Sequence, residues 1–165
     1  MQIWRLIPWA DKYGTSPKIV SRRMLSHRRV ALGWSDIGDL TQVQPASAGS
    51  ISQLIRINPG YIGLGNSAAG GRCLWALLRE MRLGDLVIIT VEGTPWMVME
   101  VASEYVYERD NALVADDLWH RRVAERTAES AKTLWHTHVV APTWNIRWPL
   151  VRMVPQRGTL TLTPR

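Results

Sequence analysis

Short stretches of alternating apolar and polar residues predict strands near the start of the chain. Residues 2–7 (QIWRLI) alternate and are rich in β-formers, which places Ile3 toward the core and Trp4 on the opposite face. An apolar run at residues 30–34 (VALGW) predicts a second strand. This strand leads into a stretch rich in turn residues, 35–40 (SDIGDL), which predicts an exposed loop.

A β-hairpin is the clearest local pattern in the sequence. Residues 85–92 (DLVIITVE) and 96–108 (WMVMEVASEYVYE) are two extended segments, and the turn residues at 93–95 separate them. Two further β-rich segments, 138–154 and 158–163, are predicted to close the chain. Pro142 and Pro149 restrict the first of these to strand ends or edges.

Helical periodicity predicts two helices in the middle of the chain. A helix begins at Asn66 or Ser67 and carries one buried stripe, formed by Leu74, Leu77, Leu78 and Met81 at positions i, i+3, i+4 and i+7. A shorter helix at residues 50–57 (SISQLIRI), capped by Ser50 or Ser52, stops before the turn at residues 58–60.

Two more helices are predicted from charge and alanine spacing. Residues 18–29 place several basic side chains on one helical face, which is either a phosphate-contacting surface or a solvated helix surface. A helix from Asp116 or Asp117 to about Trp135 is predicted from the spacing of Ala124, Ala128, Ala131 and Trp135. The chain is therefore predicted to be one α+β domain, 1–165, with a helical insertion at about 110–136.

The charge of the chain favours a polyanionic partner. Lys and Arg number 20 against 14 acidic residues, which gives a net charge of +6. Only Lys12, Lys18 and Lys132 are lysine, so the remaining basic residues are arginine, whose guanidinium group suits bidentate phosphate contacts; a GC-rich genome explains the same excess. Nine Trp, four Tyr and no Phe supply rings suited to stacking on bases.

Several functional classes are excluded or disfavoured. The apolar runs, such as 86–91, are far shorter than the roughly 20 residues of a membrane span, and the N-terminal residues lack a signal-peptide pattern, so we expect a cytoplasmic protein. The single cysteine, Cys73, is expected to be a buried, inert thiol. No catalytic or metal-ligand motif occurs, which predicts a protein that is not an enzyme and needs no cofactor or metal.

Two motifs carry a resemblance to a known family. They are the GW…GDL loop (Gly33, Trp34, Gly38, Asp39, Leu40) and the helix-turn-strand segment MRLGDLVI at residues 81–88. In this order, and followed by the EYVYE segment, they resemble the EVE-like branch of the PUA superfamily, which is related to YTH domains. The resemblance covers roughly half of the chain. The last strand of the family matches either HVVAPTW at residues 138–144 or the HRR segment at residues 120–122.

The resemblance implies a fold, a function and a set of site residues. It implies a small twisted PUA-like β-barrel flanked by helices, which takes a base, often methylated, into a cage of aromatic side chains. The implied pocket consists of Trp34, Ser35, Asp39, Trp75, Tyr105 and Tyr107. The phosphate-binding candidates are Arg22, Arg23, Arg28, Arg29, Arg121 and Arg122. A buried structural role is the competing interpretation for Trp34, and a turn or capping role is favoured for Asp39 and Asp85.

The sequence therefore predicts a reader of modified DNA. Extruding a base costs a few kcal/mol, and two aromatic walls at about 1 to 3 kcal/mol each roughly recover that cost. The family also implies a role as the targeting module of a restriction or defence system, with a nuclease as a separate partner. The short apolar runs predict no membrane contact. The alternatives are an RNA-binding PUA or ASCH-type module, and a small-molecule or protein-interaction domain on the same barrel.

Overall fold

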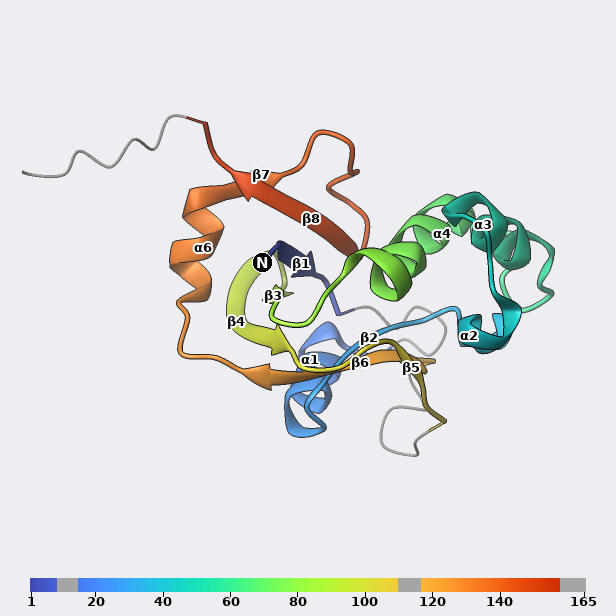
Figure 1. Cartoon of the computed structure of the whole chain (residues 1–165), viewed down its shortest axis with the longest axis horizontal. Helices are drawn as coiled ribbons and strands as arrows, with labels where there is room; N and C mark the ends of the chain where they lie inside the picture. Colours follow the sequence, from blue (N-terminus) through green and yellow to red (C-terminus); the bar gives the residue numbers. More distant parts are fainter. Residues whose placement is uncertain (9–14, 110–116, 158–165) are drawn as a thin grey trace, which may run out of the picture.

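The computed structural model describes residues 1–8, 15–109 and 117–157 (Figure 1). The strands are β1 (Ile3–Leu6), β2 (Arg29–Leu32), β3 (Leu86–Val91), β4 (Thr94–Val101), β5 (Val106–Tyr107), β6 (His120–Arg126), β7 (His138–Val140) and β8 (Leu150–Pro155). The helices are α1 (Pro17–Ser26), α2 (Leu40–Val43), α3 (Ala48–Ile57), α4 (Ser67–Trp75) and α6 (Ala131–Thr137). A 3₁₀ turn, η2 (Ser35–Ile37), follows β2, and a π-helical turn, η3 (Ala76–Glu80), extends α4.

All eight strands belong to one mixed sheet, which confirms the α+β class. The strand order is β2-β6-β4-β3-β1-β8-β7, and β5 pairs with β6. Strand β1 lies between β3, to which it is parallel, and β8, to which it is antiparallel. Within the described part of the chain, β2 and β7 end this order without pairing to each other. The sheet is therefore open, and the closed barrel expected from the resemblance is not formed, because closure requires a partner on both sides of every strand.

Both faces of the sheet are buried. Ile3 and Trp4 lie in different hydrophobic clusters, as the alternation in the first strand predicted. The Ile3 cluster is covered by α6, through Ala131, Leu134 and Trp135. The larger cluster, around Trp4, is covered by residues of α1, α3 and α4. Because each face has its own helices, β3 is buried along most of its length and reads as a continuous apolar run.

The predicted hairpin is confirmed. Strands β3 and β4 pair antiparallel, and Glu92 and Gly93 both adopt positive φ (52° and 76°), the turn conformation that matches the twist of two antiparallel strands. The second segment is not continuous, however. Strand β4 ends at Val101, and β5 is a separate short strand.

The predicted central helices are also confirmed. Helix α3 ends at Ile57 as predicted, although Ser47 rather than Ser50 or Ser52 caps it. Of the predicted stripe, Leu74, Leu77 and Met81 are buried, and Leu78 is half-buried against the same core. Figure 1 shows α3 and α4 side by side at one end of the molecule. Gly70 and Gly71 lie in the contact between them, where the absence of a side chain permits this approach.

The predicted helix from residue 116 to about 135 is wrong. Residues 120–126 form β6, which pairs with β2, β4 and β5, and only Ala131–Thr137 is helical. The alanines have helical spacing, but the backbone of this segment satisfies its hydrogen bonds with three other strands, so tertiary pairing overrides the local pattern. The expected helical insertion at 110–136 is reduced accordingly, and its residues 110–116 lie outside the described residues.

Two other boundaries differ from the sequence-based expectations. Helix α1 ends at Ser26 rather than 29, because Arg28 has a positive φ (54°) and β2 begins at Arg29. The loop predicted at residues 35–40 ends in the short helix α2, which begins at Leu40. The extended segment expected at 158–163 lies outside the described residues. Among the described helices, none combines the length and apolar character required to cross a membrane.

Candidate functional site

The loop that follows β2 is held in a sharp turn with Trp34 at its apex. Trp34 has a left-handed backbone (φ 60°, ψ 34°), a conformation that is strained for a residue with a side chain. Its indole is only 9% exposed, and Nε1 donates a hydrogen bond to Asn66 Oδ1 at 3.2 Å. A Cβ atom on Gly70 would lie 2.8 Å from the indole ring. Trp34 thus connects β2 to α4 as a core residue, and its ring is not the open stacking surface expected from the resemblance.

Ser35 is also fully occupied by internal contacts. Its N–H donates to Asp117 Oδ1 at 3.1 Å, and its hydroxyl donates to the Asp117 carbonyl at 2.8 Å. The same hydroxyl accepts from the Trp119 N–H at 3.0 Å, and the Ser35 carbonyl accepts from the Tyr107 hydroxyl at 2.7 Å. These bonds fix the loop against β5 and the start of β6, and leave no Ser35 group to receive a base amino group.

Tyr61 and Asp117 complete this support, and neither was among the residues expected at the site. The Tyr61 hydroxyl donates to Asp117 Oδ2 at 3.1 Å and accepts from the Asp36 N–H at 2.9 Å. Burial raises the pKa of Tyr61, so this hydroxyl keeps its proton. No local motif marks Tyr61, because it contacts the loop only through the fold.

His120 and Tyr105 form the floor of the network. His120 is completely buried, and its Nε2–H lies 3.2 Å from the Trp34 carbonyl, which accepts. The Tyr105 hydroxyl lies 2.6 Å from His120 Nδ1, the acceptor nitrogen in that tautomer. Burial lowers the pKa of His120 to about 4, so the imidazole is neutral at physiological pH. Tyr105 is 7% exposed and therefore serves this network rather than an open cage.

We expect the domain to lose stability as the pH falls from 7.5 to 5. His120 has a folded pKa of about 4, below its unfolded value of about 6.5, so the unfolded chain binds a proton that the folded chain excludes. The expected loss in the free energy of unfolding over this range is about 2 kcal/mol, measurable by urea denaturation. A His120→Gln variant should be less stable at pH 7.5 but nearly insensitive to this change. A wild-type protein with equal stability at both pH values would contradict the assignment.

An aromatic corner lies beside this network. We use this name for Tyr107 and Trp119, whose rings are half-buried, with centroids 6.0 Å apart and planes at 84°. The guanidinium group of Arg109 lies 4.8 Å from the Trp119 ring centroid. Trp119 Nε1 is buried and has no hydrogen-bond acceptor among the described residues. An unpaired buried donor costs about 1 to 3 kcal/mol, so this N–H is a cost to the fold.

The remaining residues expected in the pocket lie elsewhere or have other roles. Asp39 caps α2, since its Oδ1 accepts from the Thr41 N–H at 2.9 Å, and Asp85 accepts hydrogen bonds from the turn before β3. The favoured capping and turn roles are therefore confirmed. Trp75 is half-buried on α4, with the Arg79 guanidinium 6.0 Å from its ring, and none of the network bonds described above involves it.

The expected phosphate-binding arginines are mostly engaged within the protein. Arg28 forms a bidentate pair with Glu125, and Arg29 one with Glu108 at 2.9 and 3.1 Å. Of the other candidates, Arg22 is exposed on α1 and Arg23 is half-buried there.

The prediction that Arg121 and Arg122 bind phosphate is wrong, because neither side chain is exposed. Arg121 donates to the Leu118 carbonyl, and Arg122 donates to the carbonyls of Leu77 at 2.7 Å and Ser103 at 2.9 Å. Each also pairs with a carboxylate, Arg121 with Glu108 at 3.3 Å and Arg122 with Glu104 at 3.4 Å, so these buried guanidinium groups are satisfied inside the fold and do not face a phosphate.

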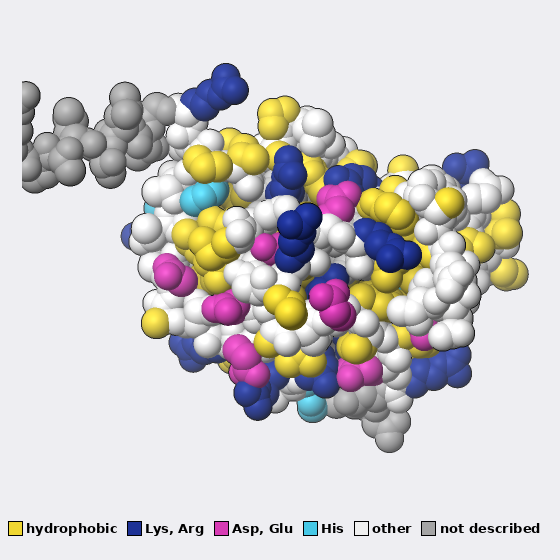
Figure 2. All heavy atoms as spheres, viewed as in Figure 1, with side chains coloured by type: hydrophobic (Ala, Val, Ile, Leu, Met, Phe, Trp, Pro, Cys, Tyr) yellow, Lys and Arg dark blue, Asp and Glu magenta, His cyan; other side chains and the backbone are white. Residues whose placement is uncertain are grey.

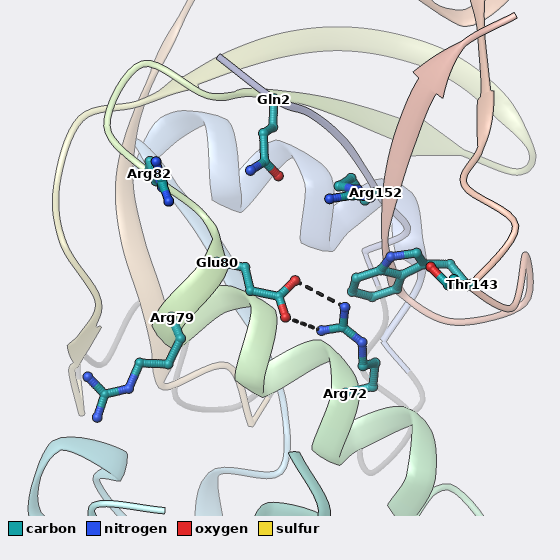
Figure 3. A pocket seen from close by; sticks show the side chains of 8 residues that line it. Gln2, Arg72, Arg79, Glu80, Arg82, Thr143 and Arg152 are labelled. Carbon is teal, nitrogen blue, oxygen red and sulfur yellow. Dashed lines mark hydrogen bonds and ion pairs between the residues drawn. The ribbon is translucent and has the colours of Figure 1, made fainter. Parts of the chain in front are cut away.

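A second polar site lies where β1 begins, η3 ends and β8 passes. It is a hollow of about 330 Å³, which we call the arginine hollow, lined by Gln2, Arg72, Arg79, Glu80, Arg82, Thr143, Trp144 and Arg152. Figure 2 shows basic side chains on this face of the molecule, and Figure 3 shows the lining residues around the space. The sequence did not indicate this site, because its walls come from both ends and the middle of the chain.

The described residues contain no group of three or more His, Cys, Asp or Glu side chains arranged to hold a metal ion. Cys73 is buried, as expected, and its thiol donates to the Leu150 carbonyl at 3.2 Å. Burial raises the pKa of Cys73 to about 12, which keeps it protonated and poorly nucleophilic.

Comparison with known proteins gives no assignment. No family model, no curated protein and no solved structure matches the chain.

Proposed function

We propose that this protein is a non-catalytic nucleic-acid-binding domain that receives a base, preferably a modified one, at the aromatic corner. The observation that carries the proposal is the perpendicular pair Tyr107–Trp119 with a guanidinium group beside it. A base that stacks on one of these rings has the other ring beside its edge. A methyl or hydroxymethyl group on that edge of the base then contacts the second ring.

The surroundings of the corner support this role. The Tyr107 hydroxyl is anchored to the Ser35 carbonyl at 2.7 Å, and the Trp119 N–H of the backbone is anchored to Ser35 Oγ at 3.0 Å, so both rings start from fixed positions. The indole N–H of Trp119 is unpaired but sealed from solvent, so it donates to a base carbonyl or ring nitrogen only when the ring turns toward the ligand. Preorganised rings and donors lower the entropic cost of binding.

Electrostatics supports a nucleic-acid ligand. The net charge of +6 attracts phosphate without regard to sequence. Arg109 is exposed and lies against the Trp119 ring. When a base stacks on that ring and displaces the Arg109 guanidinium, the guanidinium can contact the adjoining phosphate. Two of the expected phosphate-binding arginines are exposed, Arg22 on α1 and Arg28, and Arg28 is paired with Glu125.

The proposal includes the family relation inferred from the motifs. The order of a Trp-bearing first strand, the Trp34 loop, α4 and the β3–β4 hairpin is compatible with an EVE-like, PUA-type domain whose sheet is open. In that setting the chain would be the targeting module of a restriction or defence complex, with a nuclease as a separate chain.

A Trp119→Leu variant should lose about tenfold or more in affinity for the modified duplex, since stacking on one ring contributes about 1 to 3 kcal/mol. The experiment titrates methylated, hydroxymethylated and plain DNA duplexes, and a structured RNA, at one fixed salt concentration. The matched control is Trp96→Leu. Trp96 is 41% exposed on β4, which meets β6 at the Met99–Arg126 end, away from Trp119.

The proposal fails in either of two outcomes. Equal affinity for all duplexes would remove the modification preference, and an equal effect of the two substitutions would remove the aromatic corner as the site. Preference for RNA over every duplex would assign the corner to the alternative RNA-binding function. Thermal denaturation of each variant establishes that the fold is retained.

A further inference from the structure

The arginine hollow carries a surplus of positive charge. Four guanidinium groups and one carboxylate line it, and the carboxylate of Glu80 is paired with Arg72. Arg79, Arg82 and Arg152 have no carboxylate partner in the part of the chain that the structure describes. Arg82 and Arg152 lie on the walls of the hollow and Arg79 lies at its rim, with its guanidinium directed outward (Figure 3). Cations gathered around a concave surface attract a multivalent anion more strongly than the same charges spread over a convex surface.

Arg72 is held rigidly at one wall of the hollow. It forms two parallel hydrogen bonds to Glu80, at 2.7 and 3.0 Å, and its guanidinium lies 3.8 Å from the Trp144 ring centroid. Trp144 is itself buried and packs edge-on against Trp4 and Trp148. Because Arg72 uses only part of its five N–H donors in these contacts, its remaining donors are preorganised for a ligand.

Two buried polar atoms of the hollow are unpaired among the described residues. They are Gln2 Oε1, an acceptor, and Arg152 Nε, a donor. Figure 3 shows the Gln2 amide pointing into the space between Arg82 and Arg152. Both atoms are sealed from solvent, so a ligand with an anionic oxygen for Arg152 and a hydroxyl or N–H for Gln2 would satisfy them once the two side chains turn toward it.

The wall that carries these groups is fixed by Asp85. This buried carboxylate accepts hydrogen bonds from the backbone N–H groups of Gln2 at 2.7 Å and Arg82 at 3.0 Å. It also accepts from Trp4 Nε1 at 3.0 Å. The positions of Gln2 and Arg82 are therefore set by the core and not by the surface.

We propose that the arginine hollow binds a phosphomonoester carried by a hydroxylated group the size of a nucleoside. A phosphomonoester dianion matches the surplus charge better than a carboxylate does, and its oxygens accept several guanidinium bonds at once. The volume of about 330 Å³ lies at the lower end of the range of small-molecule sites, so the hollow has room for a carrier beyond the phosphate. Two sources share this chemistry: a free nucleoside monophosphate and the phosphorylated end of a nucleic acid. The inference does not depend on base binding at the aromatic corner, which is built from other elements.

Calorimetric titration of the full chain with inorganic phosphate, adenosine 5′-monophosphate and adenosine tests the proposal. We expect saturable binding of the monophosphate with a dissociation constant below about 1 mM, weaker binding of inorganic phosphate, and none of adenosine. Affinity should fall between pH 7.5 and pH 5, because the phosphomonoester gains a proton near pH 6. Binding of adenosine equal to that of the monophosphate would overturn the proposal, as would the absence of binding by both phosphate compounds.

Matched variants separate the hollow from the general charge of the protein. The double variant Arg79→Gln/Arg82→Gln changes two exposed side chains and should weaken monophosphate binding at least tenfold. Arg56→Gln/Arg126→Gln removes the same charge from exposed positions on α3 and β6, and should leave the affinity within about twofold. Equal losses in the two double variants would show non-specific attraction and overturn the site.

Oligonucleotides with and without a 5′-phosphate identify the source of the ligand. Tighter binding of the phosphorylated strand than of the free monophosphate assigns the hollow to nucleic-acid ends, and the reverse order assigns it to free nucleotides. Either order supports the hollow as the binding site if the Arg79→Gln/Arg82→Gln substitutions weaken the binding of the tighter ligand at least tenfold. If the variant bound both ligands with the affinity of the wild-type protein, the proposed site would be wrong.

Discussion

Asp85→Ala should lower the free energy of unfolding by about 3 to 4 kcal/mol, the largest effect that we expect from a single substitution in this protein. Asp85 is 1% exposed and accepts hydrogen bonds from Trp4 Nε1 and from the backbone N–H groups of Gln2 and Arg82. Its removal leaves the indole N–H of the fully buried Trp4 without an acceptor, and frees the turn that begins β3. Each unpaired buried donor costs about 1 to 3 kcal/mol, and the two backbone donors near the surface regain part of that cost from water.

Urea denaturation at pH 7 measures this loss, and Asp39→Ala is the matched control. Asp39 also accepts from a backbone N–H, but it caps the short helix α2 at a half-exposed position, so its removal should cost only about 1 kcal/mol. If Asp85→Ala were no more destabilising than Asp39→Ala, the carboxylate would not organise the β1–β3 junction as described.

Gly71→Ala should destabilise the domain by about 2 kcal/mol or more, although helix propensity alone predicts a gain of about 1 kcal/mol. Gly71 is buried in α4, and a Cβ atom there would lie 1.9 Å from Ser52 Oγ and 2.5 Å from the Ala48 carbonyl oxygen. The second contact is with backbone, which cannot rotate away, so α3 and α4 must separate. The separation would also disturb Trp34, whose ring packs against the neighbouring Gly70.

The predicted loss of stability is opposite in sign to the gain that helix propensity alone predicts. Thermal and urea denaturation of Gly71→Ala should show a lower stability, whereas Gly49→Ala in α3 should show little loss, since a Cβ there would meet only Ser47 Oγ at an ordinary 3.5 Å. Stabilisation of the domain by Gly71→Ala would contradict the close packing of α3 on α4.

Local pattern predicted those elements whose own residues determine their structure. The β3–β4 hairpin has a turn that favours positive φ, and α4 has its apolar stripe on one face, so both could be derived from neighbouring residues. Strand β6 could not, because Ala124 fits a helical pattern as well as a strand, and pairing with β2, β4 and β5 decides between them. The alternative match at His120 to Arg122 lies in this strand, where the same pairing buries both arginines.

The candidate sites show the same division. The sequence indicated the loop at Trp34 and the aromatic character of residues 105–107, but not that Trp34 would be held by Asn66 and Gly70 inside the core. Trp119 borders the predicted site without any local signal, because its contact with Tyr107 arises only when β5 pairs with β6. The arginine hollow joins Gln2 to Arg152 across strands β1 and β8, so only the folded sheet brings its walls together.

The dependence of the dissociation constant on salt concentration, measured for one duplex with and without a methylated base, tests the proposed nucleic-acid binding most directly. A protein that neutralises about three phosphates should show a slope of about −3 when the logarithm of the association constant, the reciprocal of the dissociation constant, is plotted against the logarithm of the salt concentration. We expect that slope for both duplexes, with the methylated one bound more tightly at every salt concentration. The absence of binding at low salt, or a slope near zero, would contradict the account.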